Sequence, residues 1–131
     1  MKKILLFLII MNSFLFGDLK NVNVNKSFLN KNIKIIDIRT KQEWKETGIV
    51  KNSYTLEFFD SNGNYNMKIF LKKLNKIVKK NEQFAIICRT GSRTSMIGDY
   101  LGNKAGYNVV NLKGGIMSLF RQGYKPVRYR K

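Results

Sequence analysis

Residues 84–93, FAIICRTGSR, decide the fold of this chain. The apolar part is too short for a helix and predicts a buried strand over 83–87 that runs directly into Cys88. Gly91 permits a tight turn, and a helix is expected to begin at Arg93. Ligands of parallel α/β sheets bind beyond the carboxyl ends of the strands, so Cys88 stands where a site is expected.

The segments on either side predict further strands and helices in alternation. Val22 and Val24 alternate with asparagines and suggest a short edge strand. Thr40 and Glu43 form a capping box at the start of a helix. Further strands are expected over 33–38, 53–59 and 107–112, and helices over 41–46, from 67 to about 80, from 93 to 101 and over 116–120. This alternation predicts an α/β fold, a parallel sheet flanked by helices on both faces.

Residues 1–17 have the pattern of a secretory signal peptide. Lys2 and Lys3 precede an apolar run from Ile4 to Phe16, and cleavage is expected after Gly17. The run is shorter than the roughly 20 apolar residues that span a bilayer, so stable membrane insertion is not expected, and retention as an anchor is the alternative. A polar N-terminal segment over 18–32 and a single domain over 33–131 would follow. The protein is therefore predicted to be periplasmic.

The chain is strongly basic, with 25 lysines and arginines against 8 acidic residues and a formal charge of +17. Nucleic acid, an anionic membrane surface and small anionic substrates would each suit this charge. Export argues against nucleic acid, and the spread of lysines through every segment is also typical of a compositional bias. Small anionic compounds are therefore the expected ligands, with a protein partner possible, and the sequence leaves the oligomeric state open.

Cys88 is the only cysteine, and the chain contains no histidine. A single cysteine cannot form an intramolecular disulfide, so it is an inert core residue, an intermolecular crosslink or a reactive thiol. Without histidine, Cys-His proteases, Ser-His hydrolases and histidine metal sites are excluded, and neither a metal nor a cofactor is expected. The polar residues that follow Cys88 favour the reactive thiol.

The loop after Cys88 is suited to stabilising a thiolate. With Gly91 at positive φ, successive backbone N–H groups can point at one centre, at the positive end of a helix. Arg89 and Arg93 add positive charge, so Cys88 is expected to be largely thiolate at neutral pH. The same groups would bind the terminal sulfur of a persulfide or the sulfonate of thiosulfate. The candidate substrate-binding residues are Arg89, Thr90, Gly91, Ser92, Arg93 and Thr94.

The loop CRTGSR after an apolar strand resembles the active-site loop of the rhodanese family. Residues 35–39, IIDIR, followed by Glu43-Trp44, resemble an early strand of that family, and 106–116 resemble its closing strand and turn. The resemblance covers roughly residues 33–126. Two departures are a loosely matching segment at 48–53 and Leu119 in place of a common tryptophan.

The resemblance implies a single-domain, rhodanese-like fold similar to periplasmic thiosulfate or polysulfide sulfurtransferases. Cys88 would accept sulfane sulfur from thiosulfate or polysulfide and pass it on to a thiophilic acceptor. Asp37 and Arg39 would hold the active loop, or form an ordinary buried ion pair. Two alternatives stay open: a non-catalytic persulfide carrier or sensor for a partner protein, and a cysteine-based phosphatase or arsenate reductase. The second would need an arginine six positions after the cysteine, where this chain has Thr94.

Overall fold

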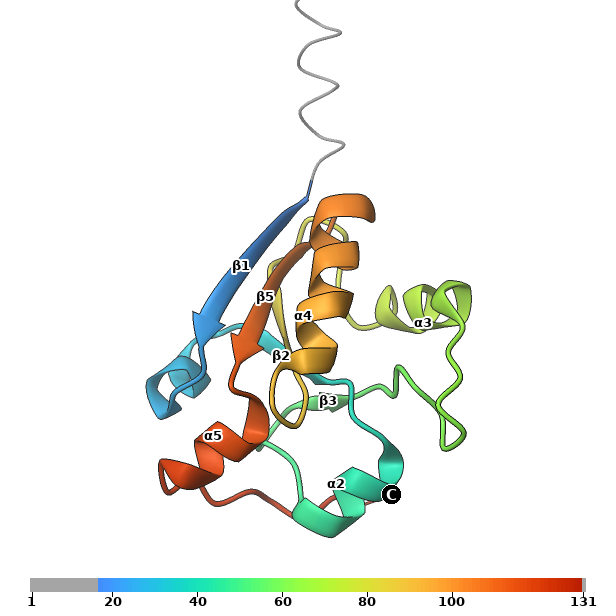
Figure 1. The fold of residues 1–131 in the computed structure, drawn as a ribbon. Coiled ribbons are helices and arrows are strands. Elements are labelled where there is room, and N and C mark those ends of the chain that lie inside the picture. Colours follow the sequence, from blue (N-terminus) through green and yellow to red (C-terminus); the bar gives the residue numbers. More distant parts are fainter. Residues whose placement is uncertain (1–16, 131) are drawn as a thin grey trace, which may run out of the picture.

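The computed structural model describes residues 17–130. The strands are β1 (Asp18–Asn23), β2 (Lys34–Asp37), β3 (Tyr54–Thr55), β4 (Phe84–Ile87) and β5 (Asn108–Lys113). The helices are η1 (Lys26–Asn30), α2 (Lys41–Thr47), α3 (Met67–Leu74), α4 (Ser92–Asp99), the π-helical turn η2 (Tyr100–Lys104) and α5 (Gly115–Arg121) (Figure 1). The predicted signal peptide lies outside the described residues except for Gly17. Within 17–130, no helix has the length and apolar character needed to cross a membrane.

The strands form one parallel sheet in the order β1-β5-β4-β2-β3. The prediction of a parallel α/β sheet is confirmed. The predicted edge strand near Val22 is also present, because β1 pairs with β5 along its whole length and Val24 continues with a hydrogen bond to the carbonyl of Lys113. Residues 18–32, expected as a polar segment ahead of the domain, thus supply β1 and η1.

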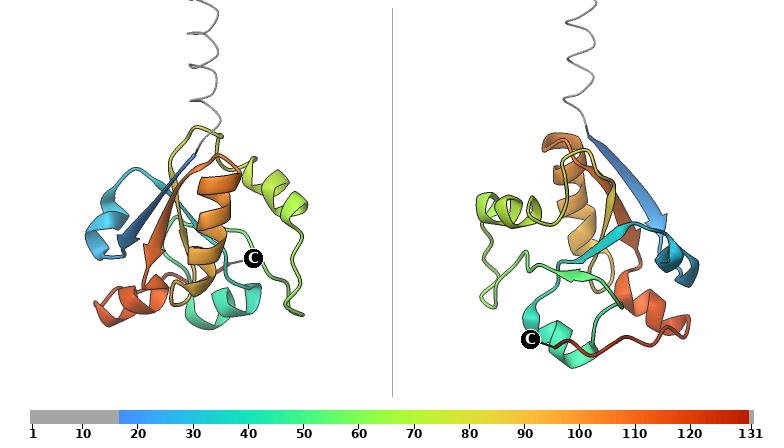
Figure 2. Two further views of the ribbon diagram at one scale, coloured as in Figure 1. Left: turned by 45° about the horizontal axis from the view of Figure 1, so that its top comes forward. Right: turned by 180° about the vertical axis from the view of Figure 1, so that it is seen from behind.

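Helices cover both faces of the sheet, as the sequence predicts (Figures 1 and 2). On one face, α3 and α4 bury Phe70, Leu74 and Ile97 against the strands. On the other face, η1 and α5 contribute a second apolar core around Phe28 and Leu119. All four residues of β4 are fully buried, because the strand is central and has a core on each side.

The structure corrects two element lengths. The helix expected to run to about residue 80 ends at Leu74, and Asn75 caps it. The apolar periodicity of the sequence continues past Leu74 because the turns that follow the helix still bury Val78. The Val78 amide donates a hydrogen bond to the Leu74 carbonyl. The strand expected over 53–59 is reduced to Tyr54–Thr55. The later amides do not continue the ladder, because Leu56 donates to Asp37 at the end of β2 and Phe58 donates to Ile38, only one residue further along.

Helix α2 begins as its sequence predicts. The Thr40 hydroxyl accepts from the Glu43 amide, and the Glu43 carboxylate accepts from the Thr40 amide, so the capping box is complete. The helix ends at Gly48, which has a φ of 79°. These local contacts fix the Glu43 side chain beside the end of β2, close to the loop that follows β4.

Candidate functional site

Cys88 follows β4 at the carboxyl edge of the sheet and is fully buried. Its Sγ accepts a hydrogen bond from the amide of Gly91 at 3.2 Å and lies 3.5 Å from the hydroxyl oxygen of Thr94. That hydroxyl also lies within hydrogen-bonding distance of the Gly91 carbonyl, at 3.2 Å. The thiol can therefore donate to Thr94, and a thiolate can instead accept the hydroxyl proton once that hydroxyl rotates.

The turn that brings these groups together depends on glycine. Gly91 has a φ of 102° and caps the N-terminus of α4. A Cβ at this position would lie 3.0 Å from the amide nitrogen of Gly114. Of the loop amides expected to converge on one centre, that of Gly91 is the one that bonds to Sγ within the described part of the chain. The predicted nest is thus represented by a single N–H and the adjoining helix end.

The first turn of α5 supports the loop from behind. The amide of Ile116 donates to the Cys88 carbonyl at 2.9 Å, and that of Met117 donates to the Arg89 carbonyl at 3.1 Å. Gly115 makes this approach possible, because a Cβ there would lie 2.3 Å from the Arg89 carbonyl oxygen. The sequence predicts a turn at Gly114-Gly115 but not its contact with the cysteine loop.

Arg93 is bound to Glu43 of helix α2. Its two terminal nitrogens donate to the two carboxylate oxygens, both at 2.8 Å, and the side chains are 24% and 17% exposed. Burial would raise the pKa of Glu43, but hydrogen bonds from Arg93 and Thr40, with the guanidinium charge, lower it to about 2. The hydrogen bonds to Glu43 raise the pKa of Arg93 against the opposing effect of burial, and the charges of Glu43, Cys88 and Asp37 add to the increase.

The sequence did not predict this ion pair of Arg93. The sequence predicts that Arg93 binds substrate, whereas in the structure its guanidinium is held by a carboxylate. The sequence predicts Glu43 as a helix-capping residue and as part of the Glu43-Trp44 motif, but not as part of the site. A local pattern could not reveal the pairing, since the two residues are 50 positions apart.

Asp37 and Arg39 form a fully buried ion pair at the end of β2. The Arg39 guanidinium also donates to the Thr47 hydroxyl at 2.8 Å and to the Gly48 carbonyl at 2.9 Å. Within residues 17–130, the hydrogen bonds of this pair join β2 to the end of α2 and include none to the cysteine loop. These contacts agree with the alternative that Asp37 and Arg39 form an ordinary buried ion pair. The pair can affect the site indirectly, through α2.

The remaining loop residues lie at the surface. Arg89, Thr90 and Ser92 are exposed, and no carboxylate of the described residues forms an ion pair with Arg89. The positive charge of Arg89 and the hydroxyl groups of Thr90 and Ser92 are therefore accessible to solvent in the loop after Cys88. The arrangement can bring a small anion towards a thiol that is itself covered.

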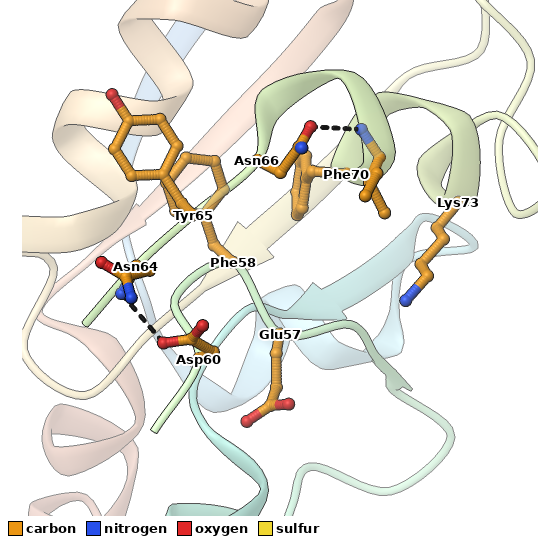
Figure 3. A pocket seen from close by; sticks show the side chains of 9 residues that line it. Glu57, Phe58, Asp60, Asn64, Tyr65, Asn66, Phe70 and Lys73 are labelled. Atoms are coloured by element: carbon orange, nitrogen blue, oxygen red, sulfur yellow. Dashed lines mark hydrogen bonds between the residues drawn. The ribbon is translucent and has the colours of Figure 1, made fainter. Parts of the chain in front are cut away.

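A separate hollow of about 320 Å³ lies between the 57–66 segment and α3 (Figure 3). Glu57 and Asp60 make part of its wall acidic, and the Asp60 carboxylate accepts from the Asn64 amide at 2.9 Å. None of the loop residues 88–94 lines it. This hollow is therefore not the approach to Cys88.

Comparison with known proteins identifies related chains. The Rhodanese-like domain model matches residues 23–122. An uncharacterized protein of Rickettsia prowazekii is 30% identical over 94 residues, which are 70% of this chain and 75% of that protein. A rhodanese-like domain protein of Staphylococcus aureus is 28% identical, with a TM-score of 0.56 over 75% of this chain and 88% of the other. A rhodanese-related protein of Thermoplasma volcanium is 24% identical, with a TM-score of 0.61 over 80% and 94%.

Proposed function

The chain belongs to the family of rhodanese-like domains, and we propose that it is a sulfurtransferase that carries sulfane sulfur as a persulfide on Cys88. One observation supports this above all: the only cysteine lies at the end of β4, where its sulfur accepts a hydrogen bond from the Gly91 amide and lies 3.5 Å from the Thr94 hydroxyl oxygen. The proposed nucleophile is the thiolate form of this sulfur.

The reaction has two displacement steps. The Cys88 thiolate attacks the outer sulfur of thiosulfate, the S–S bond of thiosulfate breaks, and sulfite leaves with the bonding electrons. A nucleophilic acceptor such as cyanide or a thiolate then attacks the terminal sulfur of the persulfide. The new S–S bond breaks, and the Cys88 thiolate is regenerated. With polysulfide as donor, a shortened polysulfide leaves in place of sulfite.

The charges around the loop favour anionic donors. Arg89 stands exposed at the entrance, while Arg93 is partly neutralised by Glu43. Thiosulfate and polysulfide are both small anions, and the strong positive charge of the chain, +17 with residues 1–17 included, would attract either. We propose export through residues 1–17 to the periplasm, where the donor and any acceptor protein would be met.

A second function has one observation in its favour. Cys88 is fully buried, which suits a persulfide carrier or sensor that protects its sulfur until a partner protein opens the loop. Phosphate or arsenate chemistry is less well supported. Arg93, one position before the expected clamping residue, is held by Glu43, and Thr94 contacts the sulfur.

The test is the intact mass of the protein after incubation with thiosulfate or with polysulfide, before and after cyanide is added. We expect a gain of one sulfur atom that cyanide removes as thiocyanate. Cys88→Ser should show no gain while its circular dichroism matches that of the wild type. A persulfide that forms but is not passed on repeatedly to cyanide or thiols would support the carrier. A wild-type protein that gains no sulfur from either donor would contradict both functions.

A further inference from the structure

The carboxylate of Glu43 is fixed next to the first turn of α4. Two parallel hydrogen bonds of 2.8 Å join it to the guanidinium of Arg93, and the Thr40 amide donates to it from the start of α2. Burial would raise the pKa of Glu43, but the hydrogen bonds lower it to about 2, so the carboxylate is charged at neutral pH. A negative charge therefore accompanies Arg93 at the cysteine loop.

The charges around the sulfur cancel when Cys88 is a thiolate. Arg89 and Arg93 are positive, while Glu43 and the thiolate are negative. Arg93 directly precedes Thr94, whose hydroxyl oxygen lies 3.5 Å from the sulfur. Hydrogen bonds to Glu43 raise the pKa of Arg93, and the charge of Cys88 adds to the increase, so this guanidinium is close enough to interact with the sulfur. The loop thus offers no net positive charge to a donor.

Sulfur donors differ in the negative charge that they bring to this loop. Thiosulfate carries two charges at neutral pH, whereas organic persulfides and thiosulfonates carry one. The thiolate repels each of these charges, and a loop without net positive charge does not compensate the repulsion. A second negative charge on the donor therefore raises the energy of the complex further.

We propose that Glu43 sets the donor specificity of the site: by neutralising Arg93, it favours singly charged organic persulfides and thiosulfonates over thiosulfate. The inference rests on the proposed sulfur transfer through Cys88. With a thiosulfonate, the Cys88 thiolate attacks the outer sulfur, the S–S bond breaks, and a sulfinate leaves with the bonding electrons. Within residues 17–130, Glu43 forms no hydrogen bond to Cys88, so it is a positioning residue that acts through Arg93.

Two donors of different charge test this specificity. The methanethiosulfonate anion and thiosulfate each transfer their outer sulfur, and kcat/KM is measured for both with cyanide as acceptor. Glu43→Gln gives the loop one more positive charge, so the ratio of kcat/KM for thiosulfate to that for methanethiosulfonate should rise by about fivefold. The rise should shrink in about 1 M salt, where the screening length is about 3 Å. An unchanged ratio would overturn the proposal, as would a rise that salt does not reduce.

Three further variants separate charge from structure. Glu46→Gln is the matched control, because it removes the same charge from an exposed position of α2 and should leave the ratio near that of the wild type. Glu43→Asp keeps the charge and should also keep the ratio. Arg93→Gln should lower the ratio, and it decides the matter if Glu43→Gln does not fold. A rise as large in Glu46→Gln as in Glu43→Gln would contradict the proposal, as would a higher ratio in Arg93→Gln.

The outcome for donor specificity is distinguishable from the outcome for sulfur transfer itself. If the wild type gains no sulfur from either donor, sulfur transfer and this specificity are both refuted. If the wild type uses both donors and every variant has the same ratio, only the role of Glu43 is refuted. For a protein that forms the persulfide without passing it on, the rate of mass gain with each donor gives the same ratio.

Discussion

Replacing Glu43 by glutamine tests how strongly its pair with Arg93 stabilises the folded chain. Burial acts to raise the pKa of this carboxyl, but the hydrogen bonds from Arg93 and Thr40 lower it from 4.5 to about 2. Without screening, a difference of this size corresponds to about 3 kcal/mol of folding stability. Both side chains are partly exposed, at 24% and 17%, so solvent screening reduces the value. We expect Glu43→Gln to lower the free energy of unfolding by about 1 to 2 kcal/mol at neutral pH.

The effect should depend on pH in a defined direction. A carboxyl whose pKa is lower in the folded state stabilises the protein where it is ionised in both states. The contribution of Glu43 to folding stability is therefore complete above pH 4.5 and is lost as the pH falls towards 2. The difference between wild type and Glu43→Gln should shrink over that interval.

Urea unfolding followed by circular dichroism measures this difference at neutral pH, near 4.5 and near 2. Glu46→Gln is the matched control, because Glu46 is exposed on the same helix and its carboxylate accepts a hydrogen bond from the Gln42 side chain. That variant should differ little from the wild type. A loss of stability in Glu43→Gln that stays constant at every pH would refute the reasoning, as would equal stability of wild type and variant at neutral pH.

Three further predictions concern the buried ion pair, the glycine behind the loop and the N-terminus. Arg39→Ala leaves the buried carboxylate of Asp37 without its partner and should lower the urea-unfolding free energy by about 3 to 5 kcal/mol; a loss below 1 kcal/mol would contradict this. Gly115→Ala should slow sulfur transfer and lower the melting temperature more than Gly123→Ala, because Gly123 also has a positive φ but no atom within 4 Å of the added carbon. Fractionation with N-terminal sequencing should find a periplasmic chain that begins near residue 18, and a full-length cytosolic chain would contradict export.

Most of the fold follows from local sequence signals. Short apolar runs predict β2, β4 and β5, since their length and composition suit buried strands. The Thr40–Glu43 box predicts the start of α2, because both partners of a capping box lie within four residues. Because Cys88 directly follows the residues of β4, the sequence also predicts its position at the carboxyl end of that strand. Each of these signals depends on neighbours along the chain.

The two element lengths that were predicted wrongly, those of α3 and β3, depend on tertiary contacts. Apolar periodicity cannot separate a longer helix from a helix followed by turns, so α3 was expected to reach about residue 80 although it ends at Leu74. Likewise, the residues after Thr55 form hydrogen bonds to the end of β2 and to the residue after it, without continuing the ladder. In both places the side chains are buried as the pattern indicates. Only the backbone hydrogen bonding differs.

The cysteine loop shows why charge near a site is hard to judge from sequence. Arg89 and Arg93 make the loop appear doubly positive, but Glu43 reaches Arg93 from a helix 50 positions earlier. Because hydrogen bonds from Arg93 and Thr40 lower the pKa of Glu43 to about 2, this carboxylate is charged at neutral pH. The positive charge available to an anionic sulfur donor is therefore mainly that of the exposed Arg89. The ion pair instead fixes α2 against the start of α4, next to the two groups that contact the sulfur.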